Sequence, residues 1–534
     1  MARTVALALA FLALMAGPAQ GSASTGRGTT DFEVIVVPGF SLDDLESVQD
    51  LGAIGLLNPG AGPETSGASA QASLVRGEVR NSLRGDIPPG PALFAVMRGE
   101  LGSARRPAIY VGLPEGGRQP NDRRYPVLVV GDGYDGILTS DSTRIPGLVS
   151  IVDVAPTALG REDALGSEPA GDAAADLRSL DDRIDGNNGV RLPATILVCA
   201  LVLALALLVP AAAVPGFAAA LVANLVLGIA GVAAFWAVLL VLGLAVALGG
   251  PLLAALLRSQ AALGALLVGV LAAYLLALGI DGTTVALSPF GPTQNSRYFG
   301  LSNLLETMLL VPALAGAALL FARLGWGAVG GTALLAFVTV AGNRFGADGG
   351  GAIVLAAGFA VLVVLLSGGG RRALALAVGA SLVLALGLIA LDAATGGSSH
   401  ITGALEDGPV SLGGDLVERV ELSWERATSS WWVSLSVLVL LAVFVLLVVR
   451  TLRRPEPLHE PAGPLPLAAA LAVSLVVNDS PTDVLLVGVA GYVAVAAGML
   501  PARWPASPFS SSPSALSSSP AAAAGTTPRL RPRP

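Results

Sequence analysis

From residue 192 onward, long apolar runs alternate with short polar breaks, a pattern typical of membrane-spanning helices. Crossing a hydrocarbon core about 30 Å thick takes roughly 20 apolar residues in a helix. The runs predict an all-α bundle of eleven spans, at 192–213, 216–231, 234–257, 260–280, 299–321, 325–341, 350–367, 372–391, 432–449, 464–477 and 484–500. The second and third runs could instead form one long broken helix over 216–257.

Residues 26–165 have a different pattern, in which short apolar runs end at Gly, Pro or Asp. Examples are "FEVIVVPGF", "AIGLLN", "PAIYVGL", "YPVLVVGD" and "GLVSIVDV". Near-continuous apolar runs of this length favour strands that are buried on both faces of a parallel sheet. With helical candidates between them, these runs predict a compact α/β domain. Residues 166–191, which are rich in acids, are predicted to be an exposed linker before the membrane.

The two ends of the sequence predict segments outside both domains. Residues 1–24 have an early arginine, a short apolar core and small residues after it, which indicates a secretory signal peptide. The alternative is a first anchoring helix, although the apolar run is short for a span. Residues 504–534 are rich in Ser, Pro and Ala, which predicts a disordered tail.

Composition supports a plasma-membrane protein and excludes several other classes. The chain is 53% hydrophobic and 13% charged, whereas soluble proteins carry about 25% charged residues. A net charge of −7 offers no basic surface for nucleic acid. The single cysteine is Cys199, and the two histidines are His400 and His459. We therefore expect no disulfide framework, no metal site and no cofactor.

The arginines predict which loops face the cytoplasm. If the α/β domain is extracytoplasmic, alternation of the spans places most short-loop arginines inside, as the positive-inside rule requires. These inner residues are Arg258, Arg323, Arg371, Arg372, Arg450, Arg453, Arg454 and Arg503. The agreement favours two helices over 216–257 and a cytoplasmic C-terminal tail. The loops "SPFGPTQNSRYFGLSN", "GNRFGADGGG", "SSHITGALEDG" and "NDSPTD" then share the outer face.

Polar groups gathered on one side of a bundle indicate an outward-facing pocket. The candidate substrate-binding residues are Arg297, Asn303, Glu306, Asn343, Arg344, Asp348, His400, Asn478 and Asp479. The two arginines at 297 and 344 would contact an anion. Asn303 and Glu306 are three residues apart and share one helix face, where Glu306 could carry a proton. Alternatively, Arg297 and Glu306 form a pair that fixes helix packing.

Each remaining motif also has a structural interpretation. The glycine triplet after Asp348 could let an anion approach the start of a helix, or it could be an ordinary turn. Asn478 and Asp479 precede a proline in a sequence that also makes a good helix cap. His400 lies in a polar loop, where a lone histidine is more often inert than catalytic.

Three stretches of the α/β domain carry a family resemblance. They are "VIVVPGFSLDDL", "LLNPGAGPETSGASAQASLVRG" and "YDGILTSDSTRIPGLVSIVDVAPTAL", within residues 31–160. Together they resemble the alkaline-phosphatase-like fold, which implies a metal ligand after the first strand and a Ser or Thr nucleophile at the start of a helix. The ligand position is occupied by Pro38, and the domain contains no histidine. Thr65, Ser66 and Ser69 stand near the nucleophile position. The resemblance therefore implies a non-catalytic relative, and the whole arrangement resembles bacterial multi-pass envelope proteins with such a domain.

These features predict a membrane-embedded protein that binds or transports a phosphorylated or anionic envelope precursor in a lipid environment. One alternative is a transferase that acts on a lipid-linked substrate, with Asp348, Asp479 or Glu306 as general base. Another is an envelope scaffold without chemistry of its own. Converging polar residues would favour a site, and scattered ones would favour the scaffold.

Overall fold

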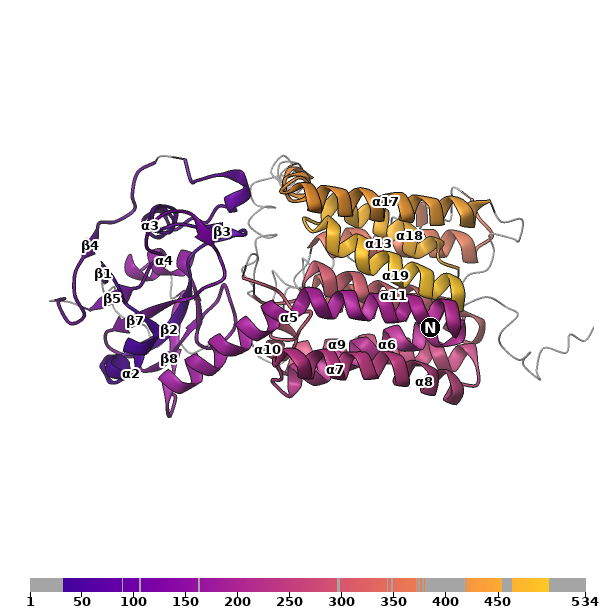
Figure 1. Cartoon of the computed structure of the whole chain (residues 1–534), viewed down its shortest axis with the longest axis horizontal. Helices are drawn as coiled ribbons and strands as arrows, with labels where there is room; N and C mark the ends of the chain where they lie inside the picture. Colours follow the sequence, from indigo (N-terminus) through magenta and orange to yellow (C-terminus); the bar gives the residue numbers. More distant parts are fainter. Residues whose placement is uncertain are drawn as a thin grey trace, which may run out of the picture.

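The computed structural model describes residues 32–498, except 89, 105–106, 162–163, 295–297, 343, 347–348, 371, 373–374, 377–378, 380–416, 418–419 and 454–462. An α/β domain lies at one end of a bundle whose long helices run side by side (Figure 1). The predicted signal peptide, the C-terminal tail and most of the predicted span 372–391 lie outside the described residues.

The α/β domain is built on one eight-stranded sheet. Its strands are β1 (Glu33–Val36), β2 (Ala53–Asn58), β4 (Val96–Arg98), β5 (Ala108–Val111), β7 (Tyr125–Val130), β8 (Gly136–Ser140), β9 (Leu148–Ser150) and β10 (Leu165–Glu168). The order is β10-β8-β2-β7-β5-β1-β4, and β9 also pairs with β2. Every residue of β2 and β5 is buried, which confirms that their apolar runs form central strands.

The sheet is mixed, whereas the apolar runs suggested a parallel one. β1 is parallel to β4 and β5, and β2 is parallel to β8 and β9. β7 is antiparallel to both β2 and β5, and β10 is antiparallel to β8. β7 follows β5 through residues 112–124, which hold no helix. A parallel return usually runs through a helix, so this connection without one is consistent with an antiparallel return.

Helices cover both faces of the sheet, which explains why its strands are apolar on both sides. Val34 belongs to one buried cluster with residues of α3 (Gly67–Arg76) and α4 (Val154–Ala158). Its neighbour Ile35 belongs to a second cluster, with α2 (Leu45–Val48) and the first turns of α5 (Ala173–Leu208). Successive strand residues point to opposite faces, so each strand contributes to both clusters.

The predicted acidic linker at 166–191 is instead strand β10 followed by the first half of the 36-residue helix α5. Ala173, Leu177 and Ile184 lie at helical spacing and are buried in the cluster on the sheet. The acidic residues occupy other faces of the helix, which explains why composition indicated an exposed segment. Because α5 then continues into the bundle, one rigid element belongs to both domains (Figure 1).

The described part of the bundle contains eight helices long and apolar enough to span a membrane, and two shorter apolar ones. After α5 come α6 (Ala213–Ile229), α7 (Phe235–Leu244), α8 (Gly250–Leu256), α9 (Gln260–Ile280), α11 (Asn303–Leu324), α12 (Trp326–Ala341), α13 (Gly349–Leu366), α17 (Trp431–Leu452), α18 (Leu465–Val477) and α19 (Pro481–Gly498). α7 and α8 belong to one candidate span, Phe235–Leu256. A multi-pass membrane protein is therefore supported, while the count of eleven spans stays a prediction.

The run at 216–257 is divided between two spans. α6 ends at Ile229 and α7 begins at Phe235, with Gly231 at a φ of 65° between them. Glycine adopts this left-handed conformation without the strain that a side chain would bring. The break agrees with the division that the arginine pattern favoured.

α11 lies at the centre of the bundle and is buried continuously from Leu304 to Leu319. It packs closely on α9, because glycines face each other across the contact. A Cβ added to Gly264 would lie 2.9 Å from the Cβ of Leu319, and one added to Gly316 would lie 3.0 Å from a methyl of Val268. Small residues allow such close packing between membrane helices. The first turn of α11, which holds Asn303 and Glu306, is therefore firmly placed.

Candidate functional site

A buried arginine joins the α/β domain to the end of the bundle. The Arg124 side chain is 1% exposed, and its guanidinium binds Asp181 at 2.6 Å and Asp185 at 2.5 Å, both on α5. It also donates to Gln294 of the bundle at 3.1 Å, and Gln294 donates to Asn121 at 3.0 Å. Burial alone would lower the pKa of Arg124, but the two acids together raise it above its ordinary value. The guanidinium therefore stays charged and holds three segments together.

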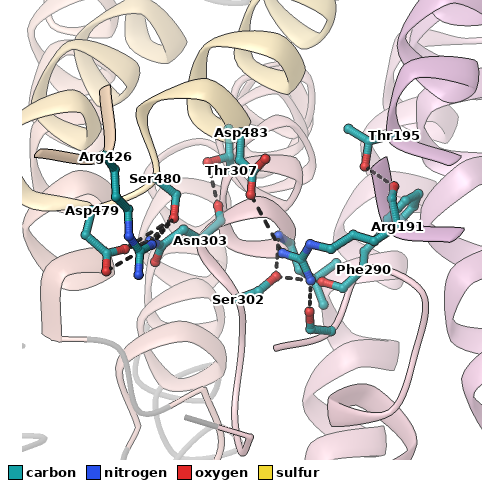
Figure 2. A network of polar contacts seen from close by, with 12 residues as sticks. Arg191, Thr195, Phe290, Ser302, Asn303, Thr307, Arg426, Asp479, Ser480 and Asp483 are labelled. Atoms are coloured by element: carbon teal, nitrogen blue, oxygen red, sulfur yellow. Dashed lines mark hydrogen bonds and ion pairs between the residues drawn. The ribbon is translucent and has the colours of Figure 1, made fainter. Parts of the chain in front are cut away.

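A polar cluster lies at the end of the bundle next to this joint (Figure 2). We define it as Asn303, Arg426, Asp479 and Ser480. The amide of Asn303 donates to Asp479 at 2.7 Å and to Ser480 at 3.3 Å. Arg426 pairs with Asp479 at 3.2 Å and donates to Ser480 at 3.0 Å. The side chains of Arg426 and Asp479 are 21% and 24% exposed, so the cluster is sheltered but reachable from solvent.

Helix ends place the members of this cluster. Ser302 caps α11, since its hydroxyl accepts from the amide of Leu305 at 3.1 Å and donates to the carbonyl of Phe290 at 2.6 Å. Asn303 is therefore held at the first position of its helix. On the other side, α18 ends at Val477 and α19 begins at Pro481, so residues 478–480 form the turn that faces Asn303. Proline is favoured in the first turn of a helix because it lacks the N–H that would otherwise be unpaired.

A second polar contact lies one turn further along α11. Glu306 is fully buried and accepts from the amide of Asn478 at 3.1 Å, while the same amide group donates to Ser474 at 2.8 Å. A Cβ added to Gly351 would lie 3.0 Å from the Glu306 carboxylate and 2.4 Å from a methyl of Val340. The carboxylate therefore lies against the first turn of α13, where the helix dipole favours negative charge. The glycine-rich turn therefore accommodates the carboxyl group of Glu306.

Another arginine lies beside the cluster on α5. Arg191 donates to the carbonyl of Gly291 and lies 3.8 Å from the carboxylate of Asp483 on α19. Its side chain is 16% exposed. Figure 2 shows Arg191 and Asp483 next to the polar cluster. Arg191 and Arg426 are therefore both partly buried arginines at this end of the bundle, and each has an acidic neighbour.

The structure brings together four of the predicted site residues, namely Asn303, Glu306, Asn478 and Asp479. Arg344 lies in a turn whose backbone meets the start of α11, since Leu301 donates to Gly346 at 3.2 Å. Its side chain is exposed. The remaining candidates, Arg297, Asn343, Asp348 and His400, lie outside the described residues. The predicted pairing of Arg297 with Glu306 therefore stays a prediction.

Sequence reasoning missed the two arginines that the structure places at the site. Arg426 precedes α17 in "SWERATSSWW", within a longer loop whose acids seemed to offset its charge. Arg191 stood at the boundary between the predicted linker and the first span. Arg191 directly precedes the first apolar run, and this position could have identified it, whereas no local pattern marks Arg426.

The hydroxyl-bearing residues near the expected nucleophile position of the α/β domain lie at the start of α3. Ser66 caps the helix, and its side chain accepts from the amide of Ser69 at 3.1 Å, while Thr65 is buried. Among the described residues, no group of three or more His, Cys, Asp and Glu side chains could hold a metal ion.

Asp153, in the "DVAPT" stretch, is a buried acid that joins two segments of the α/β domain. It accepts hydrogen bonds from Ser140 and Ser142, which join the segment before α4 to the end of β8. Burial raises the pKa of Asp153 to about 6, while the two hydroxyls oppose part of that rise. Both carboxylate oxygens are therefore used within the fold.

Comparison with protein-family models, with curated proteins and with solved structures finds no match to this chain. The resemblance of residues 31–160 to the alkaline-phosphatase-like fold stays a prediction. An interpretation of function therefore depends on the chemistry of the residues themselves.

Proposed function

We propose that this protein binds an anionic, phosphorylated envelope precursor at the polar cluster, on the extracytoplasmic face of the plasma membrane. The observation that carries the proposal is the partly exposed Arg426, which is held by a single acid, Asp479, at the end of an apolar bundle. In this account the α/β domain, without catalysing a reaction, covers the entrance to the site.

The chemistry of the cluster favours an anion. A guanidinium presents several donors in a planar fork that matches phosphate and carboxylate oxygens. One nitrogen of Arg426, Nη1, already contacts both Asp479 and Ser480, and an incoming phosphate would replace the contact with Asp479. Arg191 provides a second positive charge nearby, and the helices α11 and α19 begin at the same place. Helix N-termini add to the attraction for negative charge.

Glu306 would act as a proton or counter-ion group during transport. It is fully buried in α11 and joined through Asn478 to the turn that carries Asp479. A change in its protonation would alter its attraction to the first turn of α13, and so could shift α13 relative to α11. This coupling is the basis for proposing movement of the precursor as well as binding.

The two alternative functions fit the contacts less well. In a transferase, Asp348, Asp479 or Glu306 would take a proton from the substrate. Asp348 lies outside the described residues, and Asp479 is already occupied by Arg426 and Asn303. Glu306 is fully buried. In a scaffold, the polar residues would be scattered, whereas here residues from distant parts of the chain converge.

Replacement of Arg426 by glutamine is expected to weaken binding of a short-chain prenyl phosphate about 10- to 100-fold. A hydrogen bond to a charged group contributes roughly 1.5–3 kcal/mol, and each 1.4 kcal/mol is tenfold in affinity. Binding is measured with the full-length protein in lipid nanodiscs. Arg178→Gln is the matched control, because it removes a more exposed arginine whose partner is Glu46 of the α/β domain. Equal binding by all three proteins, or binding of the uncharged prenyl alcohol with the same affinity, would contradict the proposal.

A further inference from the structure

A short helix precedes α17 and has two different faces. Residues 420–427 are helical, and the turn at 428–430 leads into Trp431 at the start of α17. In Figure 1 this short helix is seen nearly end-on while α17 is seen from the side, so it runs across the direction of the spans. It lies at the end of the bundle that faces the α/β domain.

One face of this helix is apolar and exposed. Val420 is 42% exposed and Trp424 is 70% exposed, and they lie four residues apart on the same side. Trp431 and Trp432 are each 63% exposed, and their rings stack with centroids 3.4 Å apart. The opposite face holds Arg426, which points into the polar cluster.

The exposed face is continuous with the surface of α17. Only 6% of the apolar window of α17 is buried inside the structure. One side of the helix, with Val437, Leu440 and Phe444, packs on the bundle, and the rest of its surface faces the surroundings. A span of this kind faces lipid chains, and tryptophans gather where the lipid chains meet the head groups. A helix that crosses the spans at that level, with apolar residues outward, has the geometry of an interfacial helix.

We infer that residues 420–432 form a lipid-binding surface that lies in the interface of the membrane leaflet nearest the α/β domain. Val420, Trp424, Trp431 and Trp432 enter the boundary between head groups and acyl chains. Arg426 is on the opposite face of the same helix, so contact of the helix with the membrane surface fixes the position of Arg426. This inference goes beyond the proposed function and holds whether or not the polar cluster binds an anion.

The attraction is apolar rather than electrostatic. Glu421, on the helix, pairs with Arg84 of the α/β domain at 2.8 Å, and Glu425 follows one turn later. Arg426 is turned inward to Asp479. The surface therefore presents no excess of basic groups to lipid phosphates, and its binding is expected to be the same in zwitterionic and anionic bilayers.

The test uses tryptophan fluorescence of the full-length protein in nanodiscs. The contribution of Trp424 is obtained by subtracting the emission of the Trp424→Phe variant from that of the wild type. We expect this difference to be quenched by lipids brominated near the top of the acyl chain, equally in zwitterionic and anionic bilayers, and poorly by acrylamide in the water. Leu51→Trp is the control, since Leu51 is 53% exposed on the α/β domain away from the bundle. Its added emission should be quenched by acrylamide instead.

Three results would overturn the inference. Quenching of Trp424 by acrylamide alone would place the surface in water. Quenching by lipid only in anionic bilayers would make the attraction electrostatic. Protection from both quenchers would indicate that a second copy of the chain, or another protein, covers the surface.

Discussion

Replacing Arg124 with alanine is expected to destabilise the folded chain by about 3 kcal/mol and to loosen the α/β domain from the bundle. Removal of one partner from a buried ion pair costs roughly 3–5 kcal/mol, because the other charge is left without compensation. Here the cost falls at the lower end, since Asp181 is 17% exposed and Asp185 is 58% exposed. Gln294 would also lose one of its donors, while Tyr298 would still donate to it. Thermal unfolding and limited proteolysis in detergent micelles measure both effects.

The joint between the domains offers a matched control. Arg178→Ala removes an ion pair from α5, the helix that also carries Asp181 and Asp185. Its partner Glu46 is 71% exposed, so the expected loss of stability is below about 1 kcal/mol. Arg124→Lys should lie between the two variants, because an ammonium cannot bind both acids and Gln294 in the geometry of the guanidinium fork. If Arg124→Ala were as stable as Arg178→Ala, the buried network would not hold the domains together.

Replacing Glu306 with alanine is expected to destabilise the bundle by about 3 kcal/mol. The change removes the acceptor for Asn478, leaves that buried amide with one partner fewer, and opens a cavity at the contact with Gly351. Glu306→Gln keeps the shape and an acceptor oxygen, so it should stay within about 1 kcal/mol of the wild type. Unfolding of the reconstituted protein measures both differences.

An exposed acid provides the comparison for Glu306. Glu100→Ala makes the same chemical change on the surface of the α/β domain, where no measurable loss of stability is expected. If Glu306→Ala unfolded at the same temperature as the wild type, the carboxylate would not join α11, α13 and the end of α18. The proposed coupling between its protonation and helix position would then lose its basis.

Much of the architecture can be predicted from periodicity, because burial imposes a regular pattern on the sequence. The strands β2 and β5 read as apolar runs since both of their faces are covered. The first half of α5 could not be predicted in the same way. Its buried positions, such as Leu177 and Ile184, are widely spaced among acids that face solvent, so the charge content outweighed the weaker helical pattern.

The candidate site was predictable only where a polar residue stands out against an apolar span. Glu306 interrupts such a span and Asn478 directly follows one, and the structure brings them into contact. Arg426 could not be found in this way, because its contact with Asp479 joins positions that are distant in the sequence. The position of the Glu306 carboxyl group at the glycine-rich turn likewise depends on the packing of α11 against α13, which no local motif specifies.

The most direct test of an outward-facing anion site is the labelling of a cysteine at Ser480 in intact cells with a membrane-impermeant maleimide. Cys199, the single cysteine of the chain, is buried and is replaced by alanine to remove background. The account predicts that Ser480→Cys is labelled from outside and that a prenyl phosphate slows the labelling, whereas the uncharged prenyl alcohol does not. Labelling only after lysis, or labelling that no anion slows, would contradict it.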